Sequence, residues 1–178
     1  MSGQTSWHAF FDSTSHTMKE QTLTLHYKTY TYNELPALDR QLIDSAKEAC
    51  ASSYAPYSRF HVGAAVLLNN GEIISGSNQE NAAFPSGICA ERCAMFYANS
   101  RYPQNAVLAL AIAASPSPGG FLASPITPCG ACRQVLLETQ RRFNVPMRIL
   151  LYGTERIFTF DSLDVLLPFQ FTGEDIKS

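Results

Sequence analysis

Two short cysteine motifs contain the residue types in this sequence that could do chemistry. Cys89-Ala90-Glu91 comes first, and Pro128-Cys129-Gly130-Ala131-Cys132 follows further along the chain. Three thiolates can hold a zinc ion and leave its fourth coordination position open for water, whereas a structural site closes that position with a fourth protein ligand. Glu91 lies two residues after the first cysteine, where its carboxylate could accept a proton from that water and pass it to a substrate. The two motifs together predict zinc-assisted hydrolysis.

Both motifs lie where a helix is expected to begin. The unpaired N–H groups and the partial positive charge of a helix N-terminus favour a thiolate over a thiol. Three thiolates would give the coordination shell of one Zn²⁺ a net charge of about −1, so nearby positive charge is needed to keep the metal acidic. Arg92 and Arg133 each directly follow a motif residue. We favour Arg92 for this role, because it lies in the same helical turn as Cys89.

A closed site of four cysteines is the competing interpretation of the same residues. Cys93 lies four residues after Cys89 and could complete such a site with Cys129 and Cys132. The catalytic interpretation requires three cysteines and Glu91, whereas the closed site requires Cys93 and has no need of Glu91. Cys93 also fits as a small buried residue on a helix, the common fate of a free thiol, and Cys50 is expected in the core for the same reason.

The composition describes a globular protein with no marked affinity for polyanions. The 178 residues suit a single domain, with 46% hydrophobic and 16% charged residues. A net charge of −2 lacks the basic excess of a nucleic-acid binder. Five cysteines, four of them in two close pairs, are typical of metal or redox chemistry in a reducing compartment. No signal peptide or membrane span is visible, so we expect a cytoplasmic protein without membrane or nucleic-acid partners.

Hydrophobic periodicity predicts alternating helices and strands. Apolar residues at helical spacing favour helices, and short β-branched or continuous apolar runs favour strands. Asn69-Asn70-Gly71 is expected to supply the left-handed residues of a tight hairpin. Asp161 or Ser162 is expected to cap a last short helix before Pro168. The predicted elements are helices at about 37–53, from Cys89 onward and at 130–143, strands at 62–68, 72–77, 107–114, 147–152 and 156–160, and a loop at 115–128.

The chain divides into an N-terminal extension, residues 1–34, and one folded domain, residues 35–178. Residues 1–17 are polar and lack periodicity, so we expect disorder there, and Met18 is an alternative start position. The run at 22–32 is rich in β-branched and aromatic residues and predicts an extra strand at a sheet edge or an oligomer contact. The order of elements in the rest of the chain implies an α/β fold of three layers, α/β/α, around a mixed central sheet.

Four sequence blocks in this order resemble the small, homotetrameric class of zinc-dependent cytidine deaminases. The motif pair itself resembles the zinc deaminase pattern, in which Cys-x-Glu is followed by Pro-Cys-x-x-Cys. The resemblance extends from about Leu38 to Asp175. Its blocks are residues 56–65 (PYSRFHVGAA), 78–82 (NQENA), 87–92 (GICAER) and 128–134 (PCGACRQ).

The resemblance implies hydrolysis of cytidine or deoxycytidine to uridine or deoxyuridine and ammonia, with one zinc ion per subunit. It implies that Cys89, Cys129 and Cys132 are the zinc ligands and that Glu91 is the proton shuttle. Attack at C4 of the base would be accompanied by proton delivery from Glu91 to N3 and then to the leaving amine. A same-fold aminohydrolase acting on another nucleoside-like substrate and a non-catalytic Cys₄ zinc module remain the alternatives.

The resemblance also implies the substrate contacts. Asn78 and Glu80 match the pair that binds the ribose hydroxyls, Phe60 the aromatic residue against the base, and the backbone of Ala90 the group that reads the pyrimidine edge. Arg92 matches an arginine that offsets part of the negative charge of the thiolates. Phe171 matches an aromatic residue that crosses into a neighbour's site, which implies a homotetramer with shared active sites. The sequence departs from the family at Phe84, where a tyrosine is common, in the loop at 115–127 and in the extension 1–34.

Overall fold

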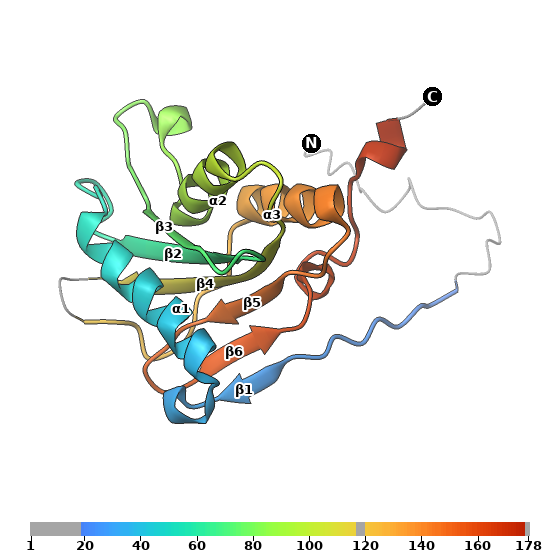
Figure 1. Ribbon diagram of the computed structural model, residues 1–178, viewed down its shortest axis with the longest axis horizontal. Coiled ribbons are helices and arrows are strands. Elements are labelled where there is room, and N and C mark those ends of the chain that lie inside the picture. The colour runs from blue at the N-terminus through green and yellow to red at the C-terminus, as the bar shows by residue number, and fades with distance from the viewer. Residues whose placement is uncertain (1–18, 117–119, 177–178) are drawn as a thin grey trace, which may run out of the picture.

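A six-stranded mixed sheet forms the middle layer of the molecule (Figure 1). The structure is a computed structural model that describes residues 19–116 and 120–176. Along the sheet the strand order is β1-β6-β5-β4-β2-β3. Strands β4 and β5 run parallel, and the other neighbouring strands run antiparallel. The strands are β1 (Lys28–Tyr30), β2 (His61–Leu68), β3 (Ile73–Ser77), β4 (Val107–Ser115), β5 (Arg148–Leu151) and β6 (Ile157–Phe160).

Helices cover both faces of this sheet, which confirms the predicted three-layer α/β/α architecture. Helix α1 (Ala37–Ala49) lies on one face, and α2 (Ala90–Arg101) and α3 (Gly130–Phe143) lie on the other (Figure 1). Successive residues of a strand point to opposite faces. In β4, Ala109 and Ala111 therefore share a core with α1, while Leu110 and Ile112 share one with α2 and α3. A helix long and apolar enough to cross a membrane is absent from the described residues.

Several element boundaries differ from the sequence prediction, for local reasons. Helix α1 ends at Ala49 and continues as one 3₁₀ turn, Cys50–Ser52. In the hairpin between β2 and β3, Gly71 alone has a positive φ (+86°). The prediction that Asn69 and Asn70 also adopt left-handed backbone is therefore wrong. Cys93, expected in the core, is half-buried, whereas Cys50 is buried.

The N-terminal extension contributes a strand that is shorter than predicted. Only Lys28–Tyr30 pair with β6, instead of the whole run 22–32. Strand β6 is itself four residues long, and a capped 3₁₀ turn at Tyr32–Glu34 turns the chain away from the sheet. Tyr27 packs against the rings of Phe158 and Phe160, with centroid distances of 5.1 and 5.6 Å. The prediction for residues 1–17 lies outside the described residues.

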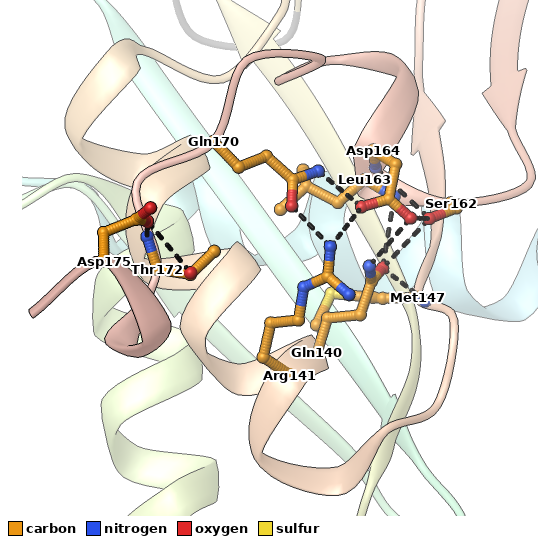
Figure 2. A network of polar contacts seen from close by, with 9 residues as sticks. All are labelled: Gln140, Arg141, Met147, Ser162, Leu163, Asp164, Gln170, Thr172 and Asp175. Atoms are coloured by element: carbon orange, nitrogen blue, oxygen red, sulfur yellow. Dashed lines mark hydrogen bonds and ion pairs between the residues drawn. The ribbon is translucent and has the colours of Figure 1, made fainter. Parts of the chain in front are cut away.

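A polar network fixes the C-terminal segment to α3 (Figure 2). Ser162 caps the 3₁₀ turn Leu163–Val165, where a helix was predicted. Asp164 accepts hydrogen bonds from Ser162 at 2.6 Å and Gln170 at 2.5 Å, and Arg141 donates to Gln170 at 2.6 Å. Burial raises the pKa of Asp164, but the hydrogen bonds from Ser162 and Gln170 outweigh burial and hold the pKa below its usual value. Asp164 is therefore an ionised anchor at neutral pH.

Candidate functional site

The three motif cysteines lie together where two helices begin on the same face of the sheet. Cys89 and Cys129 are the N-cap residues of α2 and α3, and Cys132 lies in the first turn of α3. Their three sulfur atoms lie within 4.8 Å of one another, and those of Cys89 and Cys129 are 3.9 Å apart. Sulfur atoms around a tetrahedral zinc ion are about 3.8 Å apart, given Zn–S bonds of about 2.3 Å. The spacing and the soft donor set both fit zinc.

Cys93 lies outside this group of sulfur atoms. In the described part of the chain, the group of potential metal ligands consists of Cys89, Cys129 and Cys132, without Cys93. Cys93 follows one turn later on α2, where its N–H donates to the carbonyl of Cys89. The geometry therefore offers a metal three sulfur ligands, which favours an open site over a closed Cys₄ site.

The local charges favour a thiolate at Cys89. Hydrogen bonds from Cys132, Arg92 and Cys129 lower the pKa of Cys89 to about 5, against the opposing effect of burial. Because Cys132 gives its proton to this hydrogen bond and is buried, its own pKa is raised. The Nη2 atom of Arg92 lies 3.8 Å from the Cys89 sulfur. Of the two arginines considered, Arg92 is therefore the one that lies against the Cys89 sulfur.

Glu91 is the buried acid of the site. The residue is 5% exposed, and it follows Ala90, the first residue of α2. Burial raises the pKa of the Glu91 carboxyl above its usual value, and the charge of Cys89 acts in the same direction. A raised pKa makes a carboxylate next to a metal site a stronger base for the protons of bound water.

A cavity of about 850 Å³ opens over these residues. Of the residues predicted from the sequence, all but two line it: Cys132 is fully buried beneath, and Phe171 lies elsewhere. Sequence reasoning did not assign the other lining residues to the site, although several flank the motifs that it quoted. The predicted lining residues are Phe60, Asn78, Glu80, Cys89, Ala90, Glu91, Arg92 and Cys129, and the unassigned ones include Tyr57, Ser58, Ile88, Ile126 and Thr127.

Asn78 and Glu80 are both oriented by hydrogen bonds to residues from Ser53 to Val62, the segment that leads into β2 and the first two residues of β2. The Asn78 oxygen accepts from the Ser53 hydroxyl at 2.5 Å and the Val62 N–H at 2.7 Å, and its amide nitrogen donates to the Phe60 carbonyl at 2.9 Å. Among the described residues, the second N–H of that amide has no hydrogen-bond partner and remains for a ligand. Glu80 accepts from the N–H groups of Tyr57 and Ser58 through Oε2.

These hydrogen bonds keep Glu80 ionised and are made by a turn with unusual backbone geometry. Hydrogen bonding to Ser58 lowers the pKa of Glu80, so it is a carboxylate at neutral pH. Arg59, in the same turn, has a left-handed backbone with φ of 56°. Non-glycine residues adopt this conformation at a cost, and they do so often at functional sites.

A glycine sets the position of α2 against the sheet. A Cβ atom on Gly76 of β3 would lie 2.6 Å from the backbone nitrogen of Ala94. No real Cβ contact is this short, so only glycine allows α2 to approach β3 this closely. The helix that begins with Cys89 and Glu91 is thereby held at a fixed depth on the sheet.

Phe171 and Arg133 make their polar contacts away from the three sulfur atoms. Phe171 is 59% exposed, and its carbonyl accepts a hydrogen bond from Gln134 of α3 at 2.8 Å. Arg133, the second candidate for tempering the thiolates, instead donates to the carbonyls of Pro128 and Leu166 and to the Thr127 hydroxyl.

Comparison with known proteins gives consistent matches. A family model described as the cytidine and deoxycytidylate deaminase zinc-binding region matches residues 36–147. A cytidine deaminase of Halalkalibacterium halodurans is 39% identical over 141 residues, which cover 79% of this chain and 99% of that protein. A crystal structure of cytidine deaminase from Burkholderia pseudomallei superposes with a TM-score of 0.64 at 36% identity, covering 74% of this chain and 97% of that one. The corresponding structure from Mycobacterium tuberculosis gives a TM-score of 0.58 at 34% identity, with coverages of 74% and 95%.

Proposed function

The chain belongs to the cytidine and deoxycytidylate deaminase family, and from this premise we propose that it hydrolyses free cytidine and deoxycytidine to uridine and deoxyuridine with release of ammonia. One observation carries the proposal: three sulfur atoms lie within 4.8 Å of one another, and two of their residues, Cys89 and Cys129, line the same cavity of about 850 Å³ as the buried Glu91. A cavity of this size accommodates a nucleoside, since small-molecule sites occupy about 300–1,000 Å³.

Cys89, Cys129 and Cys132 hold the zinc ion in this proposal, one ion per subunit. When bound, zinc supplies Lewis acidity that makes a hydroxide nucleophile available at neutral pH. Arg92 donates toward the Cys89 sulfur at 3.8 Å and so offsets part of the negative charge that three thiolates would place on the ion.

Glu91 moves the protons of the reaction. Its carboxylate accepts a proton from the attacking water and gives it to N3 of the cytosine ring while the new C–O bond forms at C4. The new C4 hydroxyl then gives its proton to the same carboxylate, which passes it to the exocyclic nitrogen; C4=O forms as the C4–N bond breaks, and ammonia leaves. Because burial raises the pKa of this group, its carboxylate accepts the proton of the water more readily than an ordinary glutamate would.

The remaining polar residues of the cavity recognise the nucleoside. The free N–H of the Asn78 amide and the Glu80 carboxylate bind ribose hydroxyls, and the ring of Phe60 lies against the base. The backbone N–H of Ala90 reads the pyrimidine edge, because the first N–H groups of a helix have no partner within it. A free base would leave Asn78 and Glu80 without their ligand, which costs more than a lost apolar contact.

The proposal also covers the domain bounds, the oligomeric state and the cellular compartment. We assign residues 35–178 to the deaminase domain and residues 1–34 to an extension. The exposed ring of Phe171 does not line the cavity of its own chain, which supports a homotetramer in which it enters a neighbour's site. The five cysteines, all among the described residues, form no disulfide, which suits a reducing compartment such as the cytoplasm.

Substitution of Glu91 by glutamine tests the proposed chemistry. Glutamine keeps the size and the position of the side chain but cannot accept or release the proton. We expect Glu91→Gln to bind zinc and fold as the parent does, with kcat lowered by about 10²-fold or more. Glu72→Gln, at an exposed position in the β2–β3 hairpin, is the matched control and should keep parental kcat. Parental kcat in Glu91→Gln would refute the proton-transfer role.

A further inference from the structure

We propose that Arg133 is a positioning residue that joins the loop carrying Cys129 to the C-terminal segment carrying Phe171. The inference rests on the proposed function for the roles of Cys129 and Phe171. It is independent of the thiolate charge, because the side-chain contacts of Arg133 are to oxygen atoms, whereas Arg92 is the arginine that lies against a sulfur.

The guanidinium group of Arg133 uses all three of its nitrogen atoms. Nε donates to the Pro128 carbonyl at 2.9 Å, Nη2 to the Thr127 hydroxyl at 3.0 Å, and Nη1 to the Leu166 carbonyl at 2.9 Å. A guanidinium is planar and rigid, so three acceptors on one fork are held at fixed positions relative to one another. A single lysine ammonium cannot reproduce this arrangement.

The Pro128 carbonyl and the Thr127 hydroxyl belong to the loop that positions Cys129. In the described part of the chain, residues 124–128 make no hydrogen bonds other than those to the Arg133 side chain. Pro125 and Pro128 have no N–H to donate. Thr127 lines the cavity, and Cys129, which follows Pro128 directly, is exposed. Arg133 is therefore the polar contact that fixes both the cavity rim and the approach to the most exposed of the three sulfur ligands.

The third acceptor lies at the start of the segment that leads to Phe171. That segment has separate anchors: Gln134 donates to the Phe171 carbonyl, and Asp164, Gln170 and Arg141 form the network of Figure 2. These contacts remain when Arg133 is replaced, so the segment should stay on α3 and the domain should fold. Arg133 additionally fixes the position of the loop before Cys129 relative to the C-terminal segment.

The test compares Arg133→Met, Arg133→Lys and Arg142→Met. Arg142 lies on the same helix and makes one side-chain hydrogen bond, to the Pro103 carbonyl, so its variant controls for the loss of an arginine from α3. The readouts are the rate of zinc release to a chelator, kcat and KM for cytidine, and the melting temperature. Zinc release is measured well below the melting temperature, so that global unfolding does not contribute.

We expect Arg133→Met to release zinc about tenfold or more faster than the parent, by analogy with the loss of residues that orient metal ligands. Its KM should rise more than its kcat falls. The zinc-release rate and KM of Arg133→Lys should lie between those of the parent and those of Arg133→Met. Arg142→Met should have the parent's values. Zinc release and KM equal to those of Arg142→Met would overturn the inference. If Arg133→Met does not fold, Arg133→Lys decides by the same measurements, and parental values there overturn it.

Failure of this inference and failure of the proposed function give different results. If the parent does not deaminate cytidine, the proposed function fails, while zinc release still tests the contacts to Thr127 and Pro128. If the parent deaminates cytidine and the Arg133 variants behave like Arg142→Met, only the positioning role fails.

Discussion

Replacing Gly76 by alanine should displace the catalytic helix as a unit. The added Cβ atom would lie 2.6 Å from the Ala94 nitrogen and 3.1 Å from the Ala94 Cα, both backbone atoms that cannot rotate away. An ordinary contact needs at least about 3.4 Å, so α2 must move outward by roughly 0.8 Å. Overpacking of this kind costs about 1–3 kcal/mol. A displacement of about 1 Å in a catalytic group can lower the rate by about 10²-fold.

Thermal melting and steady-state kinetics measure the two effects separately. In a domain of this size, 1–3 kcal/mol corresponds to a melting temperature lower by about 3–10 °C. Because Cys89 and Glu91 move with α2, we expect kcat/KM for cytidine to fall by about 10²-fold in Gly76→Ala. Gly173→Ala is the control, since its Cβ would meet nothing within 4 Å. A Gly76→Ala protein with parental melting temperature and kcat/KM would show that close contact between β3 and α2 does not position the site.

Phe171→Ala should raise KM for cytidine without changing zinc content, and a fully active monomer by sizing would refute the shared site. Arg148→Met should lower the free energy of urea unfolding by about 3–5 kcal/mol, because it leaves the buried Asp39 carboxylate without its partner. Asp39→Asn should lower the free energy of unfolding by less, because the Arg148 that it leaves unpaired is 45% exposed and can be hydrated. Equal losses of unfolding free energy in the two variants would contradict this reasoning. Deletion of residues 1–27 should lower the melting temperature through loss of the Tyr27 ring contacts but leave KM unchanged, because the described residues of that segment do not line the cavity. A change in KM on this deletion would place the extension at the site.

The three-layer fold was predictable because alternation in the strands and periodicity in the helices are local signals. Strand β4 shows this best: its continuous apolar run requires cover on both faces, and one face shares a core with α1 while the other shares one with α2 and α3. The length of β1 was not predictable. It pairs with β6 over three residues, and the sequence of the extension carries no information about where that pairing stops.

The candidate metal cluster could be proposed from spacing, because each motif places a cysteine at the start of a helix. The cavity walls could not be derived in the same way. Ile126 and Thr127 belong to a loop without periodicity; Ile126 packs against the hydrophobic core, and Thr127 accepts a hydrogen bond from Arg133. The same holds for Asn78, whose orientation depends on Ser53 and Phe60, both distant from it in the sequence. Contacts of this kind become visible only once the elements are packed.

Ammonia release by the zinc-loaded parent protein is the most direct test of the central claim. The protein, with zinc measured per chain, is incubated with cytidine and in parallel with free cytosine. We predict one zinc per chain, ammonia and uridine in equal amounts from cytidine, and no measurable turnover of cytosine. No ammonia from cytidine in a folded protein that holds one zinc per chain would contradict the proposed function.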